Sequence, residues 1–432
     1  MKLKIKGILV FLLLLALVAT CSACSGGSDS KEAALASPKD RMLEIIRFMS
    51  AEDGGRIAGF AGEASTAVYI QKEFGDIGLK VSTQSFPVVA FACDNAALDI
   101  LSGGDDLAHE VKVLTFSAPT PEEGITAEIV PVGLGSDEDY EGIDITGKIA
   151  LIMRGGEYFR VKVERAYEKG AAAAVFYDPN GNEAISATLT QLSSIPALSI
   201  SRSDAVALEN AIANGSSISA HMTIDSVTRD SSSSNVIGLL KSGDNPDGRQ
   251  VIVSAHYDGV DTPAANDNAS GIAVILEMAR TLVKDEIQLP YDVRFIAFGA
   301  EEIGLIGSTA YVNSLRSNEL KSIAAVLNFD MVGIGDYFEI MTVEGTKNDE
   351  LLSAFEYTLG QMGYSPVISN TDRSDHAPFS YAGVQAVDIQ MSPVDNYHTD
   401  FDTIEAIQPE NLVRMADLGI AMLKDGLVGI ND

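Results

Sequence analysis

Cysteine is scarce in this chain of 432 residues: there are three, and two of them, Cys21 and Cys24, stand near the N-terminus. Only Cys93 is left in the body of the chain. A disulfide framework is excluded there, and so is a zinc site made of thiolates, because both need several cysteines. Any metal that the body of the chain binds must therefore be held by histidine, aspartate and glutamate.

Basic residues are also few, with 30 lysines and arginines against 61 aspartates and glutamates and a net charge of −31. A chain this acidic is not expected to bind nucleic acid or an anionic membrane surface, because like charges repel. Hydrophobic residues make up 46% of the chain and charged residues 21%. This balance is typical of a folded globular protein rather than a disordered one.

The first 24 residues are typical of a bacterial lipoprotein signal peptide. Three early lysines precede an apolar run, Ile8–Ala19, whose 12 residues are too few to span a membrane. Cys21 and Cys24 follow, and the residues before each partly match a lipoprotein cleavage box. We expect an exported protein that is lipid-anchored to the bacterial cell membrane through Cys21 or Cys24, with residues 25–37 as a flexible tether. Ordinary secretion is the alternative.

The pattern of apolar and polar residues in the remaining chain changes twice, near residues 90 and 226. Residues 38–90 contain two expected helices, at 38–50 and 64–74, and a strand at 79–86. Residues 91–226 carry short apolar runs between glycines and aspartates, with one helix at 159–169, and predict an inserted β-rich α+β domain. A serine-rich run and a GDNPDG turn make residues 227–249 a predicted linker into the last part, 227–432.

Strands and helices alternate after Gln250, which predicts an α/β domain with a mostly parallel central sheet and helices on both faces. The expected strands are 250–255, 292–298, 323–329, 337–343 and 384–391. The expected helices are 270–284, 305–316, 348–362 and 409–425. Residues 38–90 are expected to belong to this domain.

Polar residues follow the apolar strands at the points where the strands end. In open α/β sheets, ligands bind beyond the carboxyl ends of the strands, so we expect these residues to share one crevice. They are His256, Asp258, Asp267, Glu301, Glu302, Asp330 and His398. Two imidazoles with three carboxylates suit two divalent cations that share one bridging carboxylate, and a further glutamate is left to act as a base.

These residues stand in motifs that occur in a recognisable order: HYD, AANDNASG, EE, NFDM and YHT. The series resembles the co-catalytic zinc metallopeptidases of the bacterial leucyl aminopeptidase type, a group that includes glutamate carboxypeptidases and glutaminyl cyclases. The resemblance covers roughly residues 38–90 and 227–430. Within the insert, GKIALIMRGGEYFRVKVERAYEKGAAAAVFY followed by IPALSI resembles a protease-associated domain.

The resemblance implies a zinc exopeptidase fold with two Zn²⁺ per chain and peptides as substrates. One zinc would be held by His256, Asp330 and a bridging Asp267, and the other by Glu302, His398 and the same Asp267. Glu301 would be the general base that activates a metal-bridging hydroxide and later acts as an acid. Asp258 would fix the tautomer of His256.

Three further residues follow less directly from the resemblance. The segment SDHAPF resembles a loop near the substrate, in which Asp375 and His376 would lie close to the reaction and His376 would hydrogen-bond the substrate or its oxyanion. Asp402 would hydrogen-bond His398. Some relatives have an oxyanion-binding tyrosine just before this loop, whereas residues 370–373 contain none.

The sequence leaves several functions open. The leading expectation is an aminopeptidase that hydrolyses the N-terminal peptide bond of peptides. A carboxypeptidase or a glutaminyl cyclase of the same fold is the alternative within the family. A catalytically silent binding protein that presents its insert is the alternative from another class, and the complete set of expected ligands and base disfavours it.

Overall fold

The computed structural model describes residues 37–50, 55–101 and 110–427. The predicted signal peptide and both candidate lipidation cysteines lie outside the described residues, as does all of the predicted tether except Ser37. Among the described helices, none is both long and apolar enough to cross a membrane.

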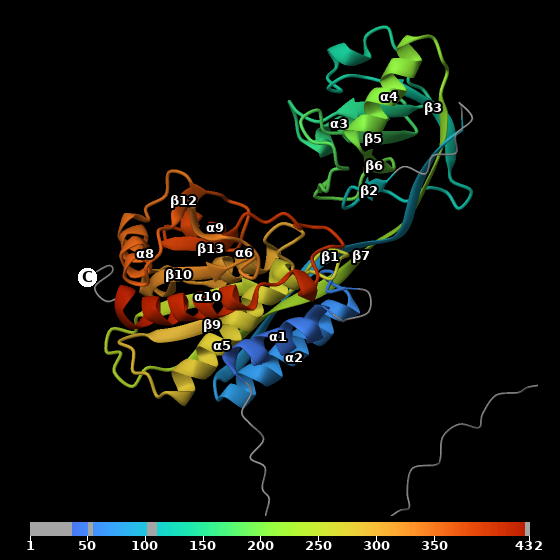
Figure 1. Ribbon diagram of the computed structural model, residues 1–432. Coiled ribbons are helices and arrows are strands. Elements are labelled where there is room, and N and C mark those ends of the chain that lie inside the picture. The colour runs from blue at the N-terminus through green and yellow to red at the C-terminus, as the bar shows by residue number, and fades with distance from the viewer. Residues whose placement is uncertain (1–36, 51–54, 102–109, 428–432) are drawn as a thin grey trace, which may run out of the picture. The chain divides into compact units, whose positions relative to one another are not determined.

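The centre of the molecule is a mostly parallel sheet, as predicted (Figure 1). Its parallel strands lie in the order β13, β10, β8 and β9, and β11, β12 and β7 extend it on either side. β11 and β7 run antiparallel to their inner neighbours. The bounds are β7 Ser219–Leu240, β8 Gln250–His256, β9 Asp292–Phe298, β10 Ile323–Phe329, β11 Tyr337–Thr342, β12 Val367–Asn370 and β13 Ala386–Ser392.

The central strands are apolar on both faces because helices cover both. Val251, Val253 and Ala255 of β8 face one hydrophobic core, whereas Ile252 faces a second, as the two-residue period of a strand requires. The first core is packed by α1 Pro38–Ser50, α2 Ala61–Ile77, α5 Gly271–Lys284, α8 Asp349–Gln361 and α10 Pro409–Ala421. The second is packed by α6 Ile306–Ser314 and α9 His376–Tyr381.

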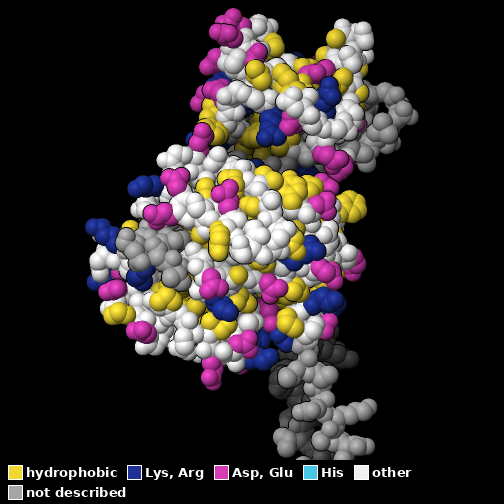
Figure 2. Space-filling model, turned by 60° about the vertical axis from the view of Figure 1, so that its left-hand side comes forward, with side chains coloured by type: hydrophobic (Ala, Val, Ile, Leu, Met, Phe, Trp, Pro, Cys, Tyr) yellow, Lys and Arg dark blue, Asp and Glu magenta, His cyan; other side chains and the backbone are white. Residues whose placement is uncertain are grey.

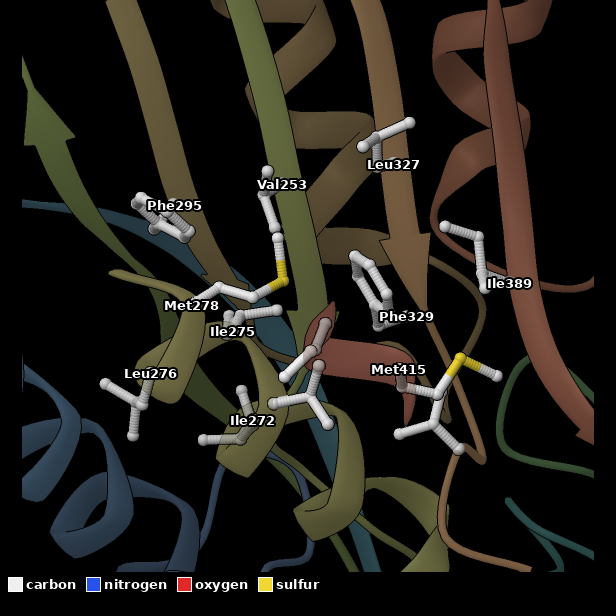
Figure 3. Packing of buried hydrophobic residues seen from close by; sticks show 14 of the residues in the cluster. Val253, Ile272, Ile275, Leu276, Met278, Phe295, Leu327, Phe329, Ile389 and Met415 are labelled. Carbon is white, nitrogen blue, oxygen red and sulfur yellow. The ribbon is translucent and has the colours of Figure 1, made fainter. Parts of the chain in front are cut away.

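The first core is built around the middle of α5. Ile272, Ile275 and Met278 project from this helix toward Val253 and Phe329 of the sheet (Figure 3), and all five side chains are fully buried. This packing fixes the start of α5 against the carboxyl ends of β8 and β10. The polar residues that follow those strands are thereby held in one region.

The insert has its own sheet and two cores. Strands β3, β4, β5 and β6 follow one another side by side, with one core on each face. The bounds are β2 Val111–Val113, β3 Ile125–Pro131, β4 Ile149–Met153, β5 Ala173–Tyr177, β6 Ala197–Ile200, α3 Phe159–Glu168 and α4 Arg202–Ala213.

Two long strands join the insert to the rest of the chain. β1, Lys80–Ile100, pairs antiparallel with β7 from Lys80 opposite Leu239 to Ile100 opposite Ala220. The prediction of a linker at 227–249 is therefore wrong for residues 227–240. The serines of that run alternate between the two faces of a paired strand, and Ser233 is buried. The predicted domain boundaries at 90/91 and 226/227 fall inside these two strands.

Several other bounds differ from those predicted. α2 is longer than the expected helix and ends where Gly78 takes a left-handed conformation. The sequence did not predict α9 or β12, which have six and four residues. On the face drawn in Figure 2, acidic side chains are spread widely and lysine and arginine side chains are interspersed among them.

Gly238 tests the packing of α2 on β7. A Cβ atom added there would lie 2.7 Å from Leu79 Cδ1 and 2.9 Å from Phe74 Cγ. We expect Gly238→Ala to destabilise the fold by about 1–3 kcal/mol because the helix must move away from the strand. Chemical denaturation measures this change. Gly75→Ala on α2 is the control, since a Cβ there meets nothing within 4 Å and should stabilise the helix by roughly 0.5–1 kcal/mol. Equal effects of the two changes would contradict the packing.

Candidate metal centre

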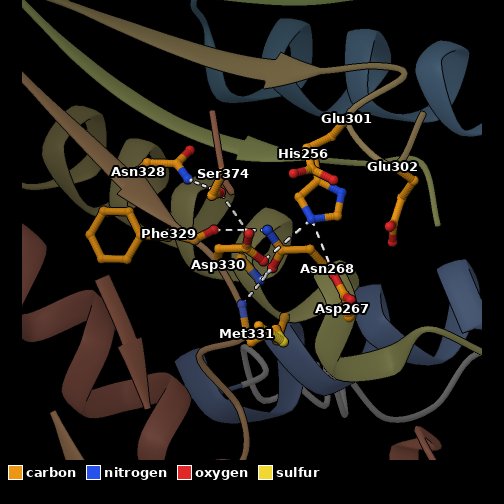
Figure 4. Close-up of polar contacts among 12 residues, drawn as sticks. His256, Asp267, Asn268, Glu301, Glu302, Asn328, Phe329, Asp330, Met331 and Ser374 are labelled. Carbon is orange, nitrogen blue, oxygen red and sulfur yellow. Dashed lines mark hydrogen bonds and ion pairs between the residues drawn. The ribbon is translucent and has the colours of Figure 1, made fainter. Parts of the chain in front are cut away.

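Five side chains that the sequence placed at strand ends come together at one edge of the sheet. Figure 4 labels four of them, His256, Asp267, Glu302 and Asp330. His256 ends β8, and Asp330 follows β10. Glu302 follows β9, Asp267 precedes α5, and His398 lies in the loop after β13. Their nitrogen and oxygen atoms form two groups of three within 4.8 Å, His256 with Asp267 and Asp330, and Asp267 with Glu302 and His398.

Asp267 belongs to both groups, and each of its carboxylate oxygens faces a different histidine. Oδ1 lies 3.1 Å from Nε2 of His256, and Oδ2 lies 3.1 Å from Nε2 of His398. Nε2 of His256 is also 3.3 Å from Asp330 Oδ1, and Nε2 of His398 is 3.0 Å from Glu302 Oε2. Asp267 therefore lies between two groups of possible ligands. Each group adds one histidine and one further carboxylate: His256 with Asp330, and His398 with Glu302.

The pKa values of these side chains show how strongly the buried groups interact in the absence of a cation. Burial raises the pKa of Glu302, and the charge of Asp267 raises it further. Burial lowers the pKa of His398, but Glu302 and Asp267 outweigh it and raise the value to about 10. Within the described part of the chain, the buried Glu302 Oε1 has no hydrogen-bond partner. Without cations the cluster would gather protons, and imidazole nitrogens with carboxylate oxygens are ligands that Zn²⁺ takes.

Glu301 lies beside this cluster and is also buried. Its carboxylate forms a third close group with His256 and Glu302. Burial raises the pKa of Glu301 well above its ordinary value, the positive charge of His256 opposes this, and the charge of Glu302 adds to it. A carboxyl group with a raised pKa can hold a proton near neutral pH, which is what a general base that later acts as an acid requires.

Asp258 acts through two different groups. Its backbone carbonyl oxygen lies 3.2 Å from Nδ1 of His256. Because a carbonyl can only accept, Nδ1 donates to it, and Nε2 is the nitrogen directed at Asp267 and Asp330, where a cation would bind. The Asp258 carboxylate instead accepts the backbone N–H groups of Glu301, at 3.0 Å, and Glu302, at 3.1 Å. It therefore holds the turn that carries both glutamates.

A buried hydrogen-bond chain that the sequence did not reveal orients Asp330. The hydroxyl of Ser374 donates to Asp330 Oδ2 at 2.7 Å, which leaves Oδ1 facing His256. The Asn328 amide donates to Ser374 at 2.8 Å, and Ser254 donates to Asn328 Oδ1 at 2.8 Å. The available sequence signal was Asn328, a polar residue inside an otherwise apolar strand.

Asp402 holds the loop of Asp267, so its predicted contact with His398 is corrected. Its two carboxylate oxygens accept the backbone N–H groups of Asn266, at 2.7 Å, and Asp267, at 3.0 Å. The peptide bond between Asp267 and Asn268 is cis. The Asn268 side chain donates to the carbonyl of Phe329 at 2.8 Å, which joins this loop to the end of β10.

Asp375 and His376, the two candidate residues in the SDHAPF segment, are fully buried. His376 Nε2 lies 3.0 Å from the carbonyl oxygen of Thr371, and burial lowers the pKa of His376 to about 4. The ring is enclosed by protein and held at Nε2, so the hydrogen bond from His376 to the substrate stays a prediction. Asp375 is equally enclosed, and burial raises its pKa to about 7.

The sequence also missed a buried arginine. Arg56 has 1% of its surface exposed and donates to the backbone carbonyls of Met49, Tyr257 and Ala264 at 2.8–2.9 Å. It therefore ties down the loop between His256 and Asp267. Burial lowers the pKa of Arg56, and the charges of Asp258 and Asp267 oppose this.

A tyrosine stands beside the second histidine. The ring of Tyr397 stacks on that of His398 with a centroid separation of 3.8 Å. Its hydroxyl accepts from Arg373 Nη2 at 3.4 Å. Residues 370–373 contain no tyrosine, but the fold brings Tyr397 to the arginine of that segment and so supplies polar groups at the partly exposed side of the site.

Comparison with known proteins matches residues 235–423 to peptidase family M28 and residues 125–208 to the PA domain. Aminopeptidase YwaD of Bacillus subtilis is 33% identical over 414 residues, covering 92% of this chain and 87% of YwaD. A probable lipoprotein aminopeptidase of Mycobacterium tuberculosis, LpqL, is 32% identical, covering 66% of this chain and 56% of LpqL. The structure of BSAP, a zinc aminopeptidase from Bacillus subtilis, matches with 31% identity and a TM-score of 0.73, covering 89% of this chain and 93% of that one.

The role of Asp402 can be tested by Asp402→Asn. An amide offers one acceptor oxygen and would turn N–H groups toward the backbone N–H of Asn266 or Asp267. We expect zinc affinity to fall by about 10- to 100-fold, as for other residues that orient a metal ligand. Zinc retained per chain after dialysis against graded chelator measures it. Asp400→Asn, at an exposed position two residues away, is the control, and unchanged retention in Asp402→Asn would refute the role.

Proposed function

The chain belongs to peptidase family M28, and on that basis we propose how its residues act in a zinc-dependent aminopeptidase. His256, Asp330 and Asp267 would hold one zinc ion, and Glu302, His398 and Asp267 a second. The observation that carries this assignment is the position of Asp267, whose two oxygens face two histidines at equal distances of 3.1 Å. Zinc bound there would polarise the scissile carbonyl and lower the pKa of the attacking water.

The proton transfers belong to Glu301. Its buried carboxylate would take a proton from the attacking water and later deliver it to the nitrogen of the leaving amine. Asp258 positions this carboxylate through the backbone of the turn, and its carbonyl accepts from Nδ1 of His256, which directs Nε2 toward the metal site. Tyr397 and Arg373 lie at the partly exposed side, where their donors can stabilise negative charge that develops on the carbonyl oxygen.

The substrate would be a peptide with a free N-terminus. The names of the relatives favour an aminopeptidase over the carboxypeptidase and cyclase alternatives. Aminoacyl-anilides are suitable probes, because release of the aniline reports attack at the first acyl group. Release of C-terminal residues from peptides with a blocked N-terminus would instead favour a carboxypeptidase.

Two neighbouring substitutions separate catalysis from metal binding. We expect Glu301→Gln to lower turnover of an aminoacyl-anilide by roughly 10²–10⁴-fold, because the proton acceptor is lost, while zinc stays bound. Glu302→Gln should lose zinc together with activity. Elemental analysis alongside kinetics measures both, and we expect two zinc ions per wild-type chain. Normal turnover in Glu301→Gln, or one zinc ion per fully active chain, would contradict the assignment.

We also propose that the chain is exported and carries a lipid anchor at Cys21 or Cys24. The support is the basic and apolar segment before these cysteines and the lipoprotein designation of LpqL. In a bacterial host fed a radiolabelled fatty acid, the full chain should incorporate label. Either Cys21→Ala or Cys24→Ala should abolish incorporation, and the other should leave it intact. Incorporation that persists in the double substitution, or none in the full chain, would refute the anchor.

A further inference from the structure

Glu63 is a buried carboxylate far from the candidate ligands in sequence and close to them in space. It lies in the first turn of α2, and 1% of its surface is exposed. Three donors converge on it. Oε1 accepts from the backbone N–H of Ala300, at 3.1 Å, and from the hydroxyl of Ser233. Oε2 accepts from the backbone N–H of Gly59, at 2.6 Å.

The Ala300 contact continues the series made by Asp258. Residues 300, 301 and 302 present three successive backbone N–H groups, of which Glu63 accepts the first and Asp258 accepts the other two. Two carboxylates from separate elements, the start of α2 and the loop after β8, therefore hold the turn that follows β9. That turn carries the proposed general base.

The turn is one that the backbone does not adopt freely. Ala300 has a left-handed conformation with φ of 55°, which is unfavourable for a residue with a Cβ atom. Gly299 before it leaves no room for a side chain, because a Cβ atom would lie 2.4 Å from Ser233 Oγ and 2.9 Å from Glu63 Oε1. A backbone in this state persists only where its surroundings fix it.

We propose that Glu63 is a positioning residue for Glu301: by accepting the Ala300 N–H it holds the turn in the conformation that directs the Glu301 carboxylate toward the reaction. The inference rests on the proposed role of Glu301 as the base. Glu63 is not among the residues that form the candidate metal groups, and its contact is at Ala300, next to Glu301 and one residue further from Glu302. Its effect on turnover should therefore exceed its effect on zinc content.

Glu63→Gln disturbs this arrangement with little change in shape. Glutamine has one acceptor oxygen, and its amide nitrogen can only donate. Backbone N–H groups donate to both oxygens of Glu63, from Ala300 on one side and from Gly59 on the other. In the glutamine variant, one of these two N–H groups must face the side-chain amide nitrogen. Either the Gly59 contact or the Ala300 contact is lost.

The matched control is Glu73→Gln on the same helix. Glu73 is also partly buried and accepts from Arg280 Nη2 at 2.9 Å, but it has no contact with the turn at residues 299–304 among the interactions of the described chain. Both substitutions replace a carboxyl group of α2 with an amide. Ser233→Ala is a milder second variant, which withdraws one donor from Glu63 and leaves the carboxylate in place.

The experiment combines kinetics with hydrogen exchange on the zinc-loaded enzyme. In Glu63→Gln we expect kcat to fall roughly 10- to 100-fold, the effect of a displaced catalytic group, with KM changed less than about two-fold and wild-type zinc content. Peptides covering residues 299–304 should exchange faster, in the zinc-free protein as well. Ser233→Ala should show both effects in smaller measure, and Glu73→Gln neither.

Other results would overturn the inference. Wild-type kcat and exchange in both Glu63→Gln and Ser233→Ala would do so, and so would loss of zinc in proportion to activity. Its failure is distinguishable from failure of the proposed function. If Glu301→Gln retains turnover, the base assignment is wrong, and exchange at 299–304 still reports whether Glu63 holds the turn.

Discussion

The structure depends on burying many carboxylates around one point. The buried carboxyl groups of this region are Glu63, Asp258, Asp267, Glu301, Asp330, Asp375 and Asp402. Burying an unpaired charge is strongly unfavourable, so each group needs a compensating partner. Arg56 supplies one positive charge, and the backbone supplies N–H groups at Asp258, Asp402 and Glu63. Asp267, Asp330 and Glu302 instead direct carboxylate oxygens at His256 and His398.

This division separates two kinds of carboxylate at the same edge of the sheet. Asp258 and Asp402 direct both oxygens to backbone N–H groups and hold loops. Asp267 and Asp330 keep an oxygen directed at an imidazole. By holding the loops, the carboxylates of the first kind fix the positions of the candidate ligands. Arg56 also holds a loop, the one between His256 and Asp267. As a cation it does so by donating to backbone carbonyl oxygens.

The sequence was sufficient where the signal is local. The apolar runs that form β8, β9 and β10 are continuous, and the polar residues at their ends identify the site because parallel strands end at one edge. It was insufficient where a role depends on distant contacts. Glu63 and Arg56 look like ordinary residues of a helix and a turn until the fold brings Ala300 and Tyr257 to them. Asp402 lies near His398 in sequence, yet its carboxylate contacts another loop.

The pairing of β1 with β7 also sets the order in which this chain can be completed. Residues 80–100 are synthesised well before residues 219–240, which supply their ladder partners. Contacts within the insert join residues that are closer in sequence than the partners in β1 and β7. Forming them therefore costs less loop-closure entropy than pairing β1 with β7. Once the insert is formed, Ile100 and Ala220 are already adjacent, and pairing can proceed stepwise toward Lys80 and Leu239. Ser233, which lies opposite Phe86 toward the Lys80 end of this ladder, is the residue of β7 that donates to Glu63.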